Sequence, residues 1–238
     1  MASERKQHTE EITTLNQSRA ALYRLLSSLY WQELTSEQIE RIRCSDVGSL
    51  DLGDRDMDDG WADIKSYLAK CNSGTRQELA VDYAHTFLAA GNNDDRMAIP
   101  FESVFMSETG LLMQGPRDEV CKVYYDEHVS PMDDLRTPED HIAFELEFLA
   151  VMAERQNEAI EAGDCDEALR IADVQASFHE QHLLNWIDVF CDAIEENCRT
   201  PFYQGVAKFT RGWVKLDGSI MNDVGIELRG GCEQALSH

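Results

Sequence analysis

Apolar residues recur at helical spacing along most of this chain, and this pattern constrains its fold more than any other feature. Leu79, Tyr83 and Phe87 fall at i, i+4 and i+8, so they share one face of a helix. Residues 142–153 are apolar on nearly all sides, which predicts a largely buried helix. We find no convincing pair of strands and no internal repeat. The sequence therefore predicts an all-α fold, a compact multi-helix bundle.

Local signals place the ends of the expected helices. Thr137 is a good N-cap and Pro138 suits the first helical position, so we expect the buried helix to begin there. Glu139 and Asp140 would then complement the positive end of its dipole. A loop rich in Asp and Gly is expected at 46–60. The expected helices cover residues 10–31, a short stretch from 37, 61–71, 75–90, 116–128, a helix from 137 up to the break at 163–164, 166–197 and 201–216.

A linker with a proline and two aspartates, residues 129–136, is the best candidate for an internal boundary. It predicts an N-terminal helical part, 1–130, and a C-terminal helical part, 131–228, joined by a hinge near 129–140. The last residues, 229–238, are expected to form a disordered tail.

The charge balance narrows the class of partner. The chain has 45 Asp and Glu residues against 21 Lys and Arg, a net charge of −24. Such a surface repels nucleic acid and anionic membranes, whereas it attracts a cationic peptide. Solubility alone would also explain the acidity, because net charge does not name a partner.

Two further patterns bear on location and redox state. Residues 1–11 are polar, and no apolar run approaches the roughly 18 residues that span a membrane, so a cytoplasmic location is expected. The seven cysteines are scattered without a CxxC pair. This argues against a zinc ribbon or an iron–sulfur cluster and predicts mostly reduced thiols.

The common enzyme signatures are missing. The chain has no GxxxxGK[ST], GxGxxG, GxSxG, HExxH or ExxH, so we expect no catalytic residues and no metal site. His179 and His182 lie three residues apart and could share one helix face to hold a metal. The alternative for this pair is an ordinary structural role.

A first candidate site begins at Glu139, where Glu139, Asp140 and His141 precede the apolar helix. His141 and Glu145 are four residues apart, so their side chains can touch. The carboxylate would raise the pKa of His141 and favour its charged form. Such a cluster could hold an arginine guanidinium through its carboxylates. The alternative is a well-capped helix whose acids only complement its dipole.

A second candidate site is formed by Phe101, Glu102 and Ser103, which follow a polar loop and a proline. A carboxylate among apolar residues suits a groove for a basic peptide. The alternative is an ordinary junction between loop and helix, with Ser103 as a cap. Trp186 could line the same groove, and core packing is the alternative for it.

These segments resemble the signatures of the TorD/DmsD/NarJ family of molybdoenzyme chaperones. One signature is an aromatic helix ending in glycine, a loop, and a Pro-aromatic-Glu-Ser-Val-aromatic stretch. Its matches are Tyr83, Phe87, Gly91 and Pro100-Phe101-Glu102-Ser103-Val104-Phe105. A second signature is an Asp-His motif that leads into a helix, here Pro138-Glu139-Asp140-His141-Ile142. A third, weaker match comprises His182-Leu183, Asn185-Trp186 and Pro201-Phe202-Tyr203.

The resemblance implies a TorD-like fold and a cytoplasmic chaperone, not an enzyme, for a molybdopterin oxidoreductase of anaerobic respiration. It implies binding of the client's signal peptide, commonly of the twin-arginine translocation type, with assistance in cofactor insertion and delay of export. The residues carried over for signal-peptide or client binding are Phe101, Glu102, Ser103, Glu139, Asp140, His141 and Glu145. No bound cofactor is expected, and weak GTP binding at Asp140 and His141 is left open. A monomer and a domain-swapped homodimer are both compatible with the resemblance.

Two other function classes stay open on the sequence. One is a metal-dependent helical-bundle enzyme that uses His141, Glu145, His179 and His182. The other is an acidic adaptor that binds a folded partner without a peptide groove.

Overall fold

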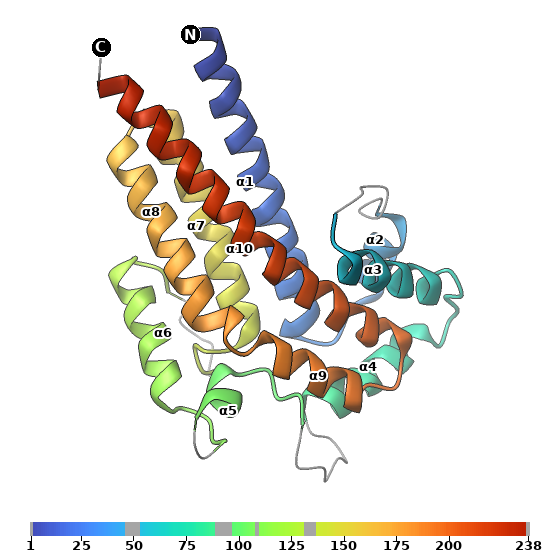
Figure 1. The fold of residues 1–238 in the computed structure, drawn as a ribbon. Coiled ribbons are helices and arrows are strands. Elements are labelled where there is room, and N and C mark those ends of the chain that lie inside the picture. The colour runs from blue at the N-terminus through green and yellow to red at the C-terminus, as the bar shows by residue number, and fades with distance from the viewer. Residues whose placement is uncertain (1, 46–52, 89–96, 108–109, 131–136, 237–238) are drawn as a thin grey trace.

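The computed structural model describes residues 2–45, 53–88, 97–107, 110–130 and 137–236. Every regular element within these ranges is a helix, which confirms the all-α prediction (Figure 1). None of these helices is long and apolar enough to cross a membrane. In chain order they are α1 (Ala2–Trp31), α2 (Ser36–Cys44), α3 (Arg55–Leu68), α4 (Thr75–Phe87), α5 (Glu102–Met106), α6 (Gly115–Asp126), α7 (Ile142–Ala162), α8 (Cys165–His179), the π-helical turn η2 (Glu180–Leu184), α9 (Ile187–Asn197) and α10 (Pro201–Leu236).

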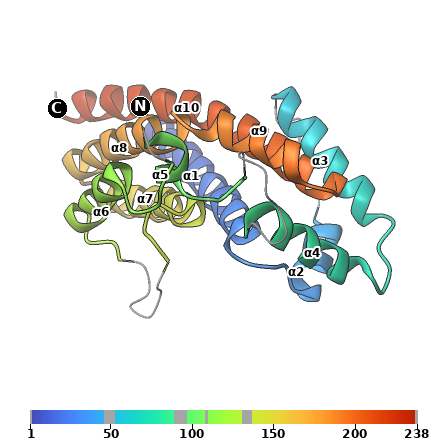
Figure 2. The same cartoon turned by 90° about the horizontal axis from the view of Figure 1, so that it is seen from below.

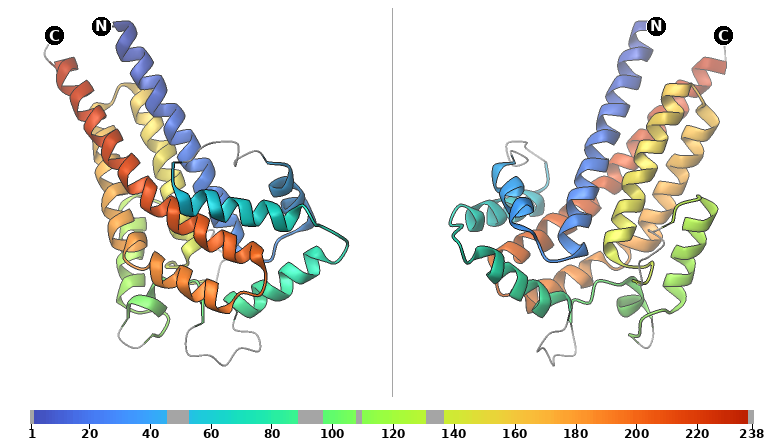
Figure 3. Two further views of the ribbon diagram at one scale, coloured as in Figure 1. Left: turned by 45° about the vertical axis from the view of Figure 1, so that its right-hand side comes forward. Right: turned by 180° about the vertical axis from the view of Figure 1, so that it is seen from behind.

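Four long helices, α1, α7, α8 and α10, form the main bundle, with both ends of the chain at one end of it (Figures 1 and 3). Helix α7 lies between α1 and α8 and buries Leu146, Leu149 and Met152 completely. Its apolar character on nearly all sides therefore follows from its place inside the bundle, as predicted.

A buried polar network ties α1 to α10. Arg19 donates to both carboxylate oxygens of Asp217, at 2.6 and 2.9 Å, and the Tyr23 hydroxyl donates to the same carboxylate at 2.5 Å. Arg19 and Asp217 are almost completely buried, so each charge depends on the other for compensation. We call Arg19, Tyr23 and Asp217 the Arg19 network.

Helices α2, α3, α4 and α9 lie at the other end of the molecule, around the first half of α10 (Figure 2). Helix α3 approaches α10 closely because glycines meet at the crossing. A Cβ atom on Gly60 would lie 2.6 Å from the carbonyl oxygen of Gly205, so neither helix could keep this position with a larger residue there.

Helices α5 and α6 lie beside the lower end of α7 and α8 in the view of Figure 1. A short antiparallel bridge between Phe101 and His141 joins the segment before α5 to the segment before α7. Its two hydrogen bonds run from the amide of Glu102 to the carbonyl of Asp140, at 3.0 Å, and from the amide of Ile142 to the carbonyl of Pro100, at 2.9 Å. This bridge sets the geometry of the site described below.

Several predicted boundaries were wrong. Helix α7 begins at Ile142 with His141 as its N-cap, not at Thr137, because the backbone before it pairs with the α5 segment. Helix α3 begins at Arg55 inside the expected loop, where Asp54 caps it. The helix expected at 166–197 is divided into α8, η2 and α9, and α10 continues past 216 to Leu236, into the segment expected as a disordered tail.

Other predictions fall partly outside the described residues. These are residues 46–52 of the expected loop, Gly91 of the first signature, and residues 131–136 of the linker and hinge. The division into two helical parts stays a prediction. Cys165 and Cys232 form a disulfide between the start of α8 and the end of α10, and five cysteines are free thiols, so the expectation of mostly reduced cysteines is met with this one exception.

Candidate functional site

The bridge between Phe101 and His141 brings the two predicted candidate sites into one. Asp140 accepts a 2.8 Å hydrogen bond from the amide of Ser103, so its carboxylate satisfies a free amide at the start of α5. Asp140 is fully buried, and its other oxygen, Oδ1, has no hydrogen-bond partner. One carboxylate thus holds the two segments together and keeps an unused acceptor.

Glu102 is the second buried carboxyl group. Its Oε2 lies 3.0 Å from Nδ1 of His182, and its Oε1 accepts a 3.3 Å hydrogen bond from Asn185. Both partners come from the η2 region, some eighty positions further along the chain. Neither His182 nor Asn185 is among the residues predicted from the sequence for this site. The signal that could have found His182 was its place in the third, weaker family match.

Glu145 is the third carboxyl group, and it is fully buried with neither oxygen hydrogen-bonded. Burial raises the pKa of this carboxyl well above its usual range, and the charges of Glu102 and Asp140 raise it further. The hydroxyl of Tyr124, on α6, is also buried without a partner, and it lies within the electrostatic reach of Glu145. We call Glu102, Asp140 and Glu145, with Tyr124 beside them, the acid cluster.

His141 is not the charged partner that its spacing from Glu145 predicted. Its ring lies among Phe101, Trp31 and Phe144, with centroids 4.9, 5.7 and 5.6 Å away. Burial lowers the pKa of His141 to about 3, so the ring is neutral. Its Nδ1 accepts a hydrogen bond from the amide of Ala143, which makes it the N-cap of α7. As a cap, His141 does not share a helix face with Glu145.

Glu139 lies apart from the acid cluster. It accepts a 2.7 Å hydrogen bond from Arg117 of α6, and this contact lowers the pKa of Glu139. Its side chain remains partly exposed. Glu139 therefore ties α6 to the bridge. The other predicted residues lie deeper: Phe101 is half-buried against His141, and Glu102, Ser103, Asp140, His141 and Glu145 are buried.

His179 and His182 do not meet on one helix face. His179 Nε2 lies 2.7 Å from the carbonyl of Val214 on α10, whereas His182 turns to Glu102. The π-helical winding of η2 separates them, and such turns are frequent at functional sites. Within the described part of the chain, no three His, Cys, Asp or Glu side chains are placed to hold a metal ion.

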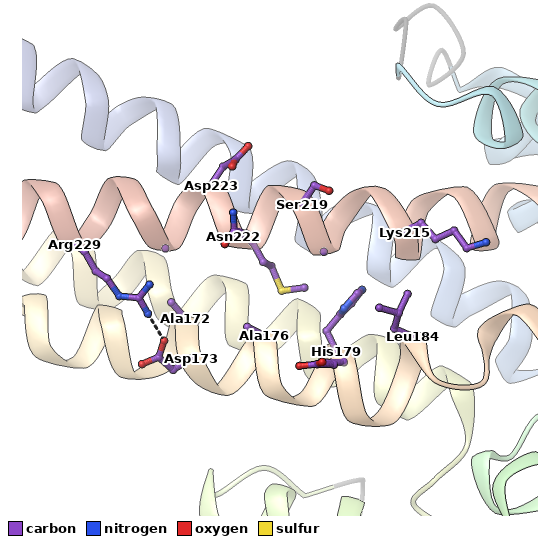
Figure 4. Close-up of a pocket in the computed structure, with 14 residues that line it drawn as sticks. Ala172, Asp173, Ala176, His179, Leu184, Lys215, Ser219, Asn222, Asp223 and Arg229 are labelled. Atoms are coloured by element: carbon purple, nitrogen blue, oxygen red, sulfur yellow. Dashed lines mark hydrogen bonds and ion pairs between the residues drawn. The ribbon is translucent and has the colours of Figure 1, made fainter.

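A cavity of about 650 Å³ lies between α8 and α10 (Figure 4). Glu180 and Leu184 of η2 line one end, and the ion pair of Asp173 with Arg229, at 2.6 Å, lies toward the other. None of the residues predicted for client binding lines this cavity.

Comparison with known proteins shows what this chain is similar to. The model of the family described as nitrate reductase delta subunit matches residues 51–192, which include the whole acid cluster. A chaperone protein TorD of Vibrio parahaemolyticus is 29% identical over 218 residues, covering 89% of this chain and 98% of that protein. Proteins of the same name from Vibrio cholerae and Aliivibrio fischeri are each 27% identical, covering 90% and 87% of this chain and 97% and 96% of their own length.

Proposed function

The chain belongs to the nitrate reductase delta subunit family, together with the TorD chaperones, and on this premise we propose that it is a chaperone of one molybdopterin oxidoreductase. Its relatives are named as chaperones and not as enzymes, in agreement with the missing catalytic signatures. In this proposal the chain binds the client's twin-arginine signal peptide in the cytoplasm, as a monomer or a swapped dimer. It keeps the leader from the export machinery while the cofactor is inserted.

The observation that carries this proposal is the acid cluster. Three carboxyl groups are buried together, and no lysine or arginine of the described residues forms an ion pair with any of them. Buried charges in proteins are normally paired. A guanidinium supplies up to five donors in a planar arrangement, which suits several carboxylate oxygens at once. The site has the chemistry of a receptor for one basic side chain.

The acid cluster is closed in this conformation, because Glu102, Asp140 and Glu145 are at most 2% exposed. A leader could reach it only if the segment that carries α5 or the helix α6 moved away. Helix α6 is held partly by polar contacts, which include the ion pair of Arg117 with Glu139 and that of Glu127 with Arg170, at 2.6 Å. In this proposal the leader binds a conformation in which one of these elements has opened.

An apolar surface for the rest of the leader lies next to the site. Met106 is the last residue of the α5 helix that carries Glu102, whereas Leu111, Leu112 and Met113 come before α6, and all four are exposed. Methionine and leucine side chains adapt to varied apolar partners. The net charge of −24 would steer the cationic end of a leader toward the molecule.

Isothermal titration with a synthetic leader tests the proposal. The leader comes from a molybdoenzyme encoded in the same genome, and a twin-lysine version measures the preference for guanidinium. We expect micromolar or tighter binding that prefers arginine. Asp140→Asn keeps an acceptor for the Ser103 amide but removes one charge, so it should weaken binding at least about tenfold.

Glu158→Gln is the matched control, because Glu158 is exposed on α7 outside the acid cluster. It removes the same charge from the molecule and should leave affinity unchanged. Equal loss of affinity in both variants would mean that only net charge matters. No binding to any leader would instead favour a chaperone of the mature apoenzyme or an acidic adaptor. Weak GTP binding at Asp140 and His141 stays a prediction, and it would require the same opening because both side chains are buried.

A further inference from the structure

Unsatisfied polar atoms gather at one place in this molecule. Among the described residues, eight buried side-chain polar atoms have no hydrogen-bond partner, and five of these belong to Ser103, Tyr124, Asp140 and Glu145. Native proteins leave few such atoms, and each requires an explanation. Scattered packing defects would not concentrate around one glutamate. The gathering points to an absent partner that donates several hydrogen bonds.

We propose that the acid cluster takes up one basic side chain of the leader in exchange for one proton, which Glu145 releases. This inference rests on the proposed function. It adds that one proton is released for each leader bound, and that the proton comes from Glu145. Before binding, Glu145 is a neutral carboxylic acid. After binding, it is a carboxylate paired with a guanidinium or ammonium group, and its proton has passed to the solvent. The buried site keeps the same net charge in both states.

The groups named in the surroundings of Glu145 include two carboxylates and a hydroxyl, and no lysine or arginine. Glu102 of α5 and Asp140 before α7 act on it as negative charges, and Tyr124 of α6 faces it with an unpaired hydroxyl. His182 of η2 is engaged with Glu102. The indole of Trp186 donates to the carbonyl of His182 at 2.6 Å and also acts on Glu145, where it opposes part of the rise in the pKa. No lysine or arginine of the described residues pairs with the three carboxyl groups. An ionised Glu145 would therefore have no lysine or arginine beside it until a ligand brings a cation.

The exchange also explains how a buried site can be stable while empty. A third ionised carboxylate without a cation would carry a large desolvation cost, whereas a protonated Glu145 avoids most of it. The incoming side chain reverses this balance because an opposite charge within a few ångströms favours the ionised form. A neutral peptide would bring no such compensation and would be rejected.

Titration calorimetry in several buffers measures the exchange directly. The protein as it exists is titrated with the synthetic leader near pH 7, in buffers that differ in their heat of ionisation. The dependence of the observed heat on the buffer gives the number of protons released. We expect about one proton per leader, and an affinity that rises up to about tenfold per pH unit.

Glu145→Gln and Glu158→Gln separate the site from the overall charge. Glu145→Gln has no proton to give, so its binding should be weaker and independent of the buffer and of pH. Glu158→Gln should release the same proton as the wild type. Binding of wild type without proton release would overturn the exchange and leave the proposed function standing. Undiminished release from Glu145→Gln would overturn the assignment to Glu145, and a wild type that binds no leader would overturn both proposals.

Discussion

The Arg19 network and the acid cluster are equally deep in the protein, but only the first contains an arginine of its own. Arg19 and Asp217 are at most 1% exposed and complete each other's hydrogen bonds, with Tyr23 on the same carboxylate. Glu102, Asp140 and Glu145 are at most 2% exposed and pair with no lysine or arginine of the described residues, whereas Glu102 contacts His182. Burial of charged side chains therefore does not by itself show that their role is structural. A complete network holds two helices together, whereas an incomplete one has room for a ligand.

The largest effect is expected from breaking the complete network. Arg19→Met leaves the Asp217 carboxylate buried without a cation, so the free energy of unfolding should fall by about 3–5 kcal/mol. Urea unfolding followed by circular dichroism measures it. Leader binding per folded molecule should not change. A loss below about 1 kcal/mol would show that Asp217 finds another partner and would remove the basis of the comparison.

At the acid cluster, we expect a substitution that stabilises the folded protein. Glu145→Leu removes two buried oxygens without partners, so the free energy of unfolding should rise by about 1–3 kcal/mol. The same variant should weaken leader binding at least about thirtyfold, because the exchanged carboxylate is gone. Thermal unfolding measures the gain in stability, and titration calorimetry measures the loss of affinity for the leader. A destabilised variant would show that Glu145 already has a partner in the empty protein.

The dependence of stability on pH sharpens the difference further. The pKa of Glu145 is raised in the folded state, so above its ordinary value of 4.5 the folded protein retains a proton that the unfolded chain has lost. Stability should then fall by about 1.4 kcal/mol per pH unit until the folded pKa is reached. Glu145→Leu lacks this slope, and its advantage over wild type should grow between about pH 5 and 7.

His141 makes the free energy of unfolding change with pH in the opposite direction, and this change is the same in wild type and in Glu145→Leu. Its pKa is lowered to about 3, so its contribution is present above its ordinary value of 6.5 and is lost as the pH falls toward 3. Both proteins share this loss, which cancels in their difference. The free energy of unfolding is measured against pH for wild type and Glu145→Leu. A constant difference between the two proteins from pH 5 to about 7 would refute the raised pKa of Glu145.

The smallest effect is expected on the surface. Arg24 lies on α1 like Arg19, and it contacts Glu147 and Glu154 of α7, but these side chains are more than two fifths exposed. Arg24→Gln should therefore cost at most about 1 kcal/mol. A loss of unfolding free energy near that of Arg19→Met, measured in the same urea experiment, would mean that burial does not determine how much an ion pair contributes to stability.

The spacing of apolar residues predicted much of the helical fold, and the sequence also predicted the three carboxyl groups of the acid cluster. The stripe of Leu79, Tyr83 and Phe87 is buried on α4, and the apolar run of α7 is buried in the bundle, because both follow from periodicity alone. The start of α7 did not follow from it. The Thr-Pro signal at residues 137–138 was outweighed by pairing with Pro100 and Glu102, a contact between segments far apart in sequence.

The chemistry of the site depended on partners that spacing cannot show. The i, i+4 rule for His141 and Glu145 assumes that both are helical, and the N-cap position of His141 removes that condition. Whether each group is charged followed from burial, which isolated His141 among aromatic rings and Glu145 among acids. Tyr124 and His182 reach the acid cluster from elements whose placement the sequence did not reveal.

The turn at Glu180–Leu184 has a consequence for the history of this chain. A π-turn holds one residue more than the α-helical winding on either side, as an inserted codon would leave it. Removing one residue from this turn would let it wind as an ordinary α-helix and would leave the residues after it in their register. The same deletion inside α8 would turn everything that follows by about 100°, so Asn185 would lose Glu102 and Trp186 would leave its stacked position 5.5 Å from Phe105. We therefore expect a one-residue deletion to be tolerated better in this turn than in α8.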